Sequence, residues 1–167
     1  ERLSGPDRAG IDSGLVILAP KNLSGRPLSA IDSTYYASDS LEISKQLAGV
    51  NLRVDFMQLF EVALKTAVVE EGDGLSLKGL KLHAALETWD SSSLADDGML
   101  VVSLAGALSR SHDGVLIARD FRSHSFRLLD IGADGEVLGA SRIIKGRYET
   151  LAYALASSLV RRLFTQL

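Results

Sequence analysis

Residues 99–121 read MLVVSLAGALSRSHDGVLIARDF, two apolar runs separated by one Asp–Gly pair. The first run alternates with the two-residue period of a strand that has one buried face. Its apolar positions on that face are Leu100, Val102, Leu104 and Leu108. In the second run, which continues to residue 126, Val115, Ile117 and Phe121 alternate with more polar positions. Because Asp–Gly is typical of tight hairpin turns, the segment predicts a β-hairpin that turns at Asp113 and Gly114.

Further strands are predicted on both sides of this hairpin. Residues 80–89 alternate in the same way, and residues 137–144 predict a shorter strand. Residues 15–19 (LVILA) form a continuous apolar run that Pro20 ends, which suits a buried strand. Asp–Gly pairs also occur at residues 97–98 and 134–135. Three such pairs between apolar runs predict an antiparallel meander of about four strands.

Two segments have the spacing of amphipathic helices. Between residues 51 and 71 the apolar side chains recur every three or four positions, with Asn51 as the expected N-cap. In the C-terminal segment, residues 148–166, leucines recur every four positions, and Gly146 marks the expected boundary before it. Each segment is apolar on one face only. The order of elements predicts an α+β fold, a two-layer sandwich of a mostly antiparallel sheet of about four to five strands with both helices on one face.

The length of 167 residues fits one domain. Residues 1–14 are polar and contain three Gly and one Pro, so we expect a flexible N-terminal lead followed by a single domain over residues 15–167. The hydrophobic fraction of 46% and the charged fraction of 23% are ordinary for a soluble globular chain. The net charge of -3 argues against a large nucleic-acid footprint. Cysteine is absent, which excludes disulfides, thiolate zinc sites and cysteine nucleophiles.

No catalytic or metal-binding motif stands out. His83, His112 and His124 lack the spacing of zinc ligands. The chain also lacks a G-x-S-x-G nucleophile elbow and the glycine-rich loops that bind phosphates. We therefore predict no catalytic residues, no metal site and no cofactor. A hydrolase whose Ser, His and Asp come from distant segments stays open as an alternative.

Three aromatic residues are candidates for contact with a partner. Tyr35 and Tyr36 are adjacent in a segment whose period is neither that of a strand nor that of a helix. We expect an edge strand or surface loop at residues 34–37. Trp89 ends the strand at residues 80–89, on the face that carries His83 and Glu87. Tyr and Trp are enriched at the centres of interfaces, so these residues are the predicted binding set, although a partly buried rim position would also explain Trp89.

The order of elements resembles that of small bacterial envelope lipoproteins. The resemblance rests on LVILAPKNLSG (residues 15–25), the helix NLRVDFMQLFEVALKTAVVEEG (51–72), the strand LKLHAALETW (80–89), the hairpin at 99–121 and the closing helix YETLAYALASSLVRRLF (148–164). The families it points to are the YajG-type lipoproteins and the auxiliary lipoproteins of ABC-type, MCE-associated transport systems.

This resemblance implies a non-enzymatic domain in the periplasm, anchored to the outer membrane by a lipid on an N-terminal cysteine outside this chain. The absence of an initial Met and of Cys fits the removal of such an N-terminus. The implied role is an accessory subunit of an envelope protein complex, such as ABC/MCE-type transport components or outer-membrane assembly factors, without nucleic acid. The exposed sheet face, a strand edge or the Tyr35–Tyr36 loop would make the contact. A small-molecule or lipid-binding module, with a groove between helices and sheet, is the alternative.

Overall fold

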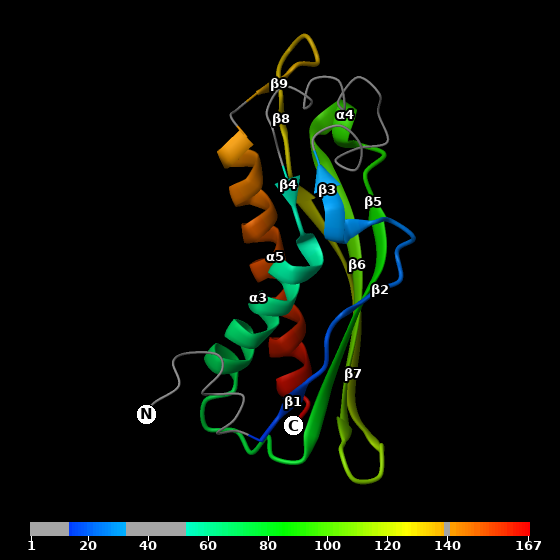
Figure 1. The fold of residues 1–167 in the computed structure, drawn as a ribbon, viewed down its shortest axis with the longest axis vertical. Helices are drawn as coiled ribbons and strands as arrows, with labels where there is room; N and C mark the ends of the chain where they lie inside the picture. Colours follow the sequence, from blue (N-terminus) through cyan, green and yellow to red (C-terminus); the bar gives the residue numbers. More distant parts are fainter. Residues whose placement is uncertain (1–13, 33–52, 139–140) are drawn as a thin grey trace.

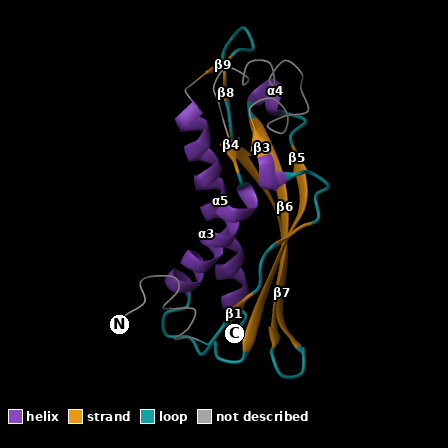
Figure 2. Cartoon of the chain, in the orientation of Figure 1, coloured by secondary structure: helices purple, strands orange, loops and turns teal. Residues whose placement is uncertain are grey.

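A computed structural model describes residues 14–32, 53–138 and 141–167 of the chain. The molecule is elongated, with one layer of helices and one layer of strands along its long axis (Figure 1). Both long helices lie on the same side of the sheet (Figure 2). The predicted α+β sandwich, a mostly antiparallel sheet with two helices on one face, is confirmed.

Three long strands form the centre of the sheet: β5 (Leu80–Asp90), β6 (Met99–Arg110) and β7 (Leu116–Arg127). They are antiparallel neighbours in the order β5-β6-β7. The predicted hairpin between β6 and β7 is confirmed. In its turn, the Asp113 carboxylate accepts a hydrogen bond from the Val115 backbone N at 3.1 Å. This bond stabilises the loop that lets β7 return beside β6.

Two short strands complete the five-stranded sheet on the other side of β5. They are β1 (Val16–Ile17) and β2 (Lys21–Asn22), and both run parallel to β5. The predicted strand at residues 15–19 is therefore present but shorter. Pro20 has no backbone N–H to donate. Its position between β1 and β2 fits the break in pairing with β5 that separates these two strands.

The first long helix, α3, spans Phe56–Glu71. It begins later than predicted, because residues Arg53–Val54 form strand β4, which pairs with β3 (Ile31–Asp32). The N-cap is Asp55 and not Asn51: the Asp55 carboxylate accepts a hydrogen bond from the Gln58 backbone N at 3.0 Å. The short 3-10 helix η1 (Leu28–Ala30) lies beside α3.

The second long helix, α5, spans Ser141–Phe164 and so begins before the predicted residue 148. Gly146 lies inside the helix and is not its boundary. The predicted strand at residues 137–144 is correct only for β9 (Val137–Leu138), which pairs with β8 (Asp130–Ile131) across the Asp134–Gly135 turn. Within α5, Ile144, Tyr148, Leu151 and Leu155 are buried at the three- and four-residue spacing of a helix, which the sequence interpretation missed at Ile144.

The Asp97–Gly98 pair does not turn a hairpin. It ends a short helix, α4 (Leu94–Asp97), inserted between β5 and β6. Gly98 takes the left-handed conformation at φ 74°, and its backbone N donates to the Leu94 carbonyl at 3.1 Å. Asp–Gly serves helix ends as well as hairpins because both need a residue that tolerates positive φ. The meander is therefore three long strands, and the parallel strands β1 and β2 extend the sheet.

The core lies between the sheet and the two long helices. Its largest fully buried side chains include Tyr148, Phe56, Phe60, Leu28, Leu64, Leu77, Leu82 and Leu86. The four apolar positions predicted for one face of β6 are all buried. Residues 1–13 lie outside the described residues, so the boundary between lead and domain stays a prediction. None of the helices in the described part of the chain has the length and apolar character needed to cross a bilayer.

Candidate functional site

The face of the sheet that points away from α3 and α5, here called the outer face, is the candidate site. Strand pairing places its side chains in rows, since directly paired residues share a face. One row contains Ala85, Ala105 and Phe121, and the row beside it contains His83, Ala107 and Arg119. Lys21 on β2 extends the first row, because it pairs with Ala85. The side chains between these rows point into the core.

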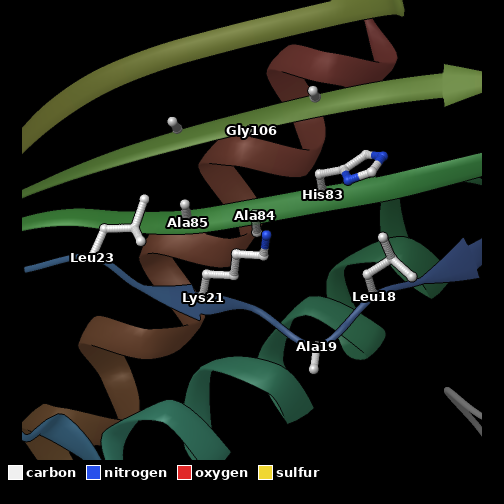
Figure 3. A pocket seen from close by; sticks show the side chains of 10 residues that line it. Leu18, Ala19, Lys21, Leu23, His83, Ala84, Ala85 and Gly106 are labelled. Carbon is white, nitrogen blue, oxygen red and sulfur yellow. The ribbon is translucent and has the colours of Figure 1, made fainter. Parts of the chain in front are cut away.

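A hollow of about 310 Å³ lies on the outer face. Small side chains and backbone, at Ala85, Ala105, Gly106 and Ala107, form its floor. Figure 3 shows the Leu18, Lys21 and Leu23 side chains along one border and His83 along the sheet, with the helices on the far side. The hollow exists because short side chains on β5 and β6 stand next to longer ones on the segment that carries β1 and β2.

A second hollow adjoins the first across β6. It measures about 480 Å³, is lined by Arg119, Asp120 and Phe121, and shares Ala105 and Gly106 with the first. Because the two hollows share these residues, we treat them together as one site, here called the trough, whose lining residues extend from β2 to β7. Phe121 stands at its β7 border with 63% of its surface exposed, the largest exposed fraction among the large hydrophobic side chains that are exposed in the described residues.

Most charged side chains on the outer face around the trough are basic. They are Lys21, Lys81 and Arg119, with His83 among them, while Glu87, two residues after Ala85 on β5, is acidic. Asp120 lines the trough, but it pairs with Gly106, whose row faces the helices. In the described part of the chain, the three basic groups form none of the identified salt bridges. The trough therefore combines an apolar floor with more basic than acidic side chains around it, on a chain whose net charge is -3.

Sequence reasoning did not identify the trough. Alanine is common both in cores and on surfaces, so Ala85, Ala105 and Ala107 carry little information alone. A usable signal was present: these alanines occupy positions that alternate with the buried leucines of β5 and β6, where polar side chains are usual. Outward alanines on neighbouring strands indicate a surface that is smooth and apolar.

Trp89 is in the core, contrary to the sequence interpretation. A register shift between Leu86 and Thr88 places one extra residue in β5, so Trp89 pairs with Val102 on the inner face and no longer shares the face of His83. Only 4% of its surface is exposed. Its ring meets Phe56 edge to face at 5.0 Å and stacks on Tyr148 at 6.3 Å. A partner cannot reach it while the core is intact.

The other two predicted contact residues, Tyr35 and Tyr36, lie outside the described residues. Their role stays a prediction.

The histidines lie far apart along the fold and do not gather into one site. His83 is on β5, His112 is in the hairpin turn 3.4 Å from the Asp113 carboxylate, and His124 is on β7. Desolvation, with added repulsion from Arg162 and Arg122, lowers the pKa of His124. Within the described residues, no three His, Asp or Glu side chains gather as a metal site.

One Ser–His contact occurs beside the trough. His83 Nε2 and Ser109 Oγ are 2.9 Å apart, which is within hydrogen-bond reach. Nucleophilic catalysis also needs a group that orients the histidine, and in the described residues no acidic side chain accepts a hydrogen bond from His83. Only 8% of Ser109 is exposed. The contact satisfies a nearly buried hydroxyl, and we do not assign it a catalytic role.

The groove predicted between helices and sheet is not where the structure is hollow. The interface between α5 and the sheet is filled by buried side chains such as Leu104, Leu108, Leu155 and Leu159. In the described part of the chain, hollows lie instead on the outer face and between α3 and α5, where Leu59, Val62 and Tyr153 line a hollow of about 360 Å³.

Neither a protein-family model nor a curated protein matches the sequence. Among solved structures, the fold is similar to that of a DUF330 protein from Xanthomonas campestris, with a TM-score of 0.52 and 13% identity over 91% of this chain and 82% of that chain. The PelC dodecamer from Paraburkholderia phytofirmans is more distant, with a TM-score of 0.42 and 13% identity over 100% of this chain and 91% of that chain. Lipoprotein GNA1162 from Neisseria meningitidis has a TM-score of 0.34 and 16% identity over 85% of this chain and 96% of that chain. At these identities, what the chain shares with the Xanthomonas protein is the fold.

Proposed function

We propose that this chain is a non-enzymatic domain of a bacterial envelope lipoprotein and works by binding another protein. The observation that carries the proposal is the outer face: α3 and α5 cover one side of the sheet, while the other side carries the trough and the exposed Phe121. An exposed apolar surface rimmed by polar groups is typical of interaction sites.

The finer assignment is an accessory subunit in envelope transport or outer-membrane assembly, of the YajG type or the ABC/MCE type. It is supported by the resemblance in the order of elements, and the fold shared with the DUF330 protein is compatible with it. In this proposal a lipid on a cysteine upstream of Glu1 holds the domain at the periplasmic side of the outer membrane. The outer face is then free to contact a partner complex.

Analysis of the complete reading frame in its own bacterium tests the assignment. Mass spectrometry of the mature N-terminus is expected to find a diacylglyceryl-modified cysteine upstream of Glu1, and fractionation is expected to find the protein in outer membranes. Cross-linking in intact cells is expected to join the domain to envelope transport or assembly proteins. A start Met close to Glu1, or recovery in the cytosol, would contradict the assignment.

A lipid-binding or small-molecule module is the second candidate, favoured by the volume of the first hollow. Its 310 Å³ is near the lower end of the roughly 300–1,000 Å³ that ligand pockets occupy. Organic extraction of the purified protein, followed by mass spectrometry, tests this candidate. A stoichiometric acyl chain that is lost in Ala105→Leu would favour it over a protein partner.

The hydrolase alternative is tested at the Ser–His contact. A fluorophosphonate probe labels activated serines, and we expect no labelling of this chain. If labelling occurs and is absent in Ser109→Ala but retained in Ser103→Ala, the non-enzymatic proposal is wrong.

A further inference from the structure

We propose that the trough binds an acidic amphipathic helix of a partner protein, with the apolar face of that helix on the alanine floor. This inference rests on the proposed function, in that it names the chemistry of the partner that the outer face would accept.

The shape of the trough favours a helix laid on the sheet. Side chains at Ala85, Ala105 and Ala107 are the shortest that keep a Cβ, so bulky side chains of a partner can approach the sheet closely. The trough crosses β2, β5, β6 and β7, which at about 4.8 Å per strand is wider than a helix of about 10 Å diameter. A helix there would form a third layer that mirrors α3 and α5.

The sheet edge is a poorer docking place than the outer face. An added strand would need the outward backbone groups of β7, but the Gln166 side chain already bonds the Arg119 backbone N at 3.4 Å and its O at 2.9 Å. Asp120 and Arg122 lie on the side of β7 that faces the helices. Inward charges on an edge strand oppose the addition of another strand.

The charges select an acidic partner. Lys21 stands at one border of the trough and Arg119 at the other, with Lys81 in the row next to His83. A helix with carboxylates on both flanks of its apolar face would meet positive charge on each side. The same arrangement disfavours a second copy of this chain on the outer face, because like charges would face one another.

Calorimetry with synthetic peptides tests the inference on the purified chain. The probe is an 18-residue helix with Leu at three- and four-residue spacing and Glu on both flanks, and its counterpart carries Lys in place of each Glu. The Glu peptide is expected to bind and the Lys peptide is not. Binding is expected to weaken as salt rises, because exposed charges are screened.

Two variant pairs locate the binding site. The double variant Lys21→Glu, Arg119→Glu is expected to weaken binding of the Glu peptide by about tenfold, since both flanking attractions become repulsions. Lys65→Glu, Lys145→Glu makes the same change in net charge on the helix layer and is expected to stay within about twofold of wild type. Ala105→Leu fills the floor of the trough and is expected to weaken binding by about tenfold. Ala154→Leu, at an exposed position of α5, is expected to leave binding unchanged. Circular dichroism verifies that each variant is folded.

Several outcomes would overturn the inference. These are equal binding of both peptides, no binding of the Glu peptide at millimolar concentration, or an equal loss of affinity for the Glu peptide in the two charge-reversal variants. Flotation with vesicles of phosphatidylglycerol that depends on Lys21 and Arg119, without peptide binding, would assign the face to a lipid surface. Each of these results leaves the lipid anchor and envelope location untouched, because those are measured on the mature N-terminus and by fractionation.

Discussion

Leu159 on α5 packs against the backbone of Gly106 in β6: a Cβ added to Gly106 would lie 2.5 Å from Leu159 Cδ1 and 3.0 Å from its Cγ. The absence of a side chain at Gly106 lets the helix approach the sheet. Gly106 also contributes backbone atoms to the floor of the trough on the outer face. One glycine therefore serves the core on one side and the candidate site on the other.

Gly106→Ala is expected to lower the free energy of unfolding by about 1–3 kcal/mol, because Leu159 is 2% exposed and has little room to move. Chemical denaturation measures the change. In the double variant with Leu159→Ala, the three atoms nearest to the added methyl are gone, so the cost of Gly106→Ala should be much smaller on that background. Full additivity of the two substitutions would contradict the close contact.

Trp89, the single tryptophan, reports directly on the register shift in β5. Its fluorescence is expected to be blue-shifted and poorly quenched by iodide, because 4% of the side chain is exposed. Trp89→Ala should lower the free energy of unfolding by about 3–5 kcal/mol, and Trp89→Phe by less. Strong quenching in the folded protein would instead place the ring at the surface.

Tyr148→Phe is expected to raise the free energy of unfolding at neutral pH by about 1 kcal/mol. The Tyr148 hydroxyl is buried and has no hydrogen-bond partner in the described structure, so its removal relieves a desolvation cost and keeps the ring contacts with Phe56 and Trp89. Denaturant titration at pH 7 measures the change. A loss of stability above 1 kcal/mol would show that the hydroxyl has a partner in solution.

The same residue predicts a pH dependence. Burial raises the pKa of Tyr148 well above its usual range. Above about pH 10 the unfolded chain loses this proton while the folded protein keeps it, so the free energy of unfolding should fall as the pH rises. Tyr148→Phe should flatten that slope. Tyr153→Phe should change it less, because the Tyr153 ring is exposed and its interaction with Glu70 is screened.

Asp55→Ala is expected to lower the free energy of unfolding by about 1 kcal/mol, because the first turn of α3 loses the carboxylate that accepts a hydrogen bond from the Gln58 backbone N. Asp55→Asn is the matched control, since its side-chain oxygen can accept the same bond. Thermal unfolding compares the two variants. Equal destabilisation by Ala and Asn would mean that charge, and not the cap, is what matters at this position.

The features predicted correctly are those set by neighbouring residues. The alternation of Leu100, Val102, Leu104 and Leu108 requires a strand with one buried face, and Asp113 supplies turn chemistry within two residues of itself. The helical spacing of the α3 and α5 segments likewise identified both helices. The errors at their ends arose because a strand pair competes for Arg53–Val54 and because α5 extends back to Ser141, which buries Ile144 in the core.

The α+β class, the central hairpin and the two amphipathic helices follow from local patterns, because periodicity and turn chemistry act over a few residues. The burial of Trp89 depends on strand pairing, since one extra residue in β5 reverses the face of each residue after it. The candidate site depends on strand pairing as well. Ala85, Ala105 and Phe121 become one surface only when three strands pair in register, and no local pattern contains that register.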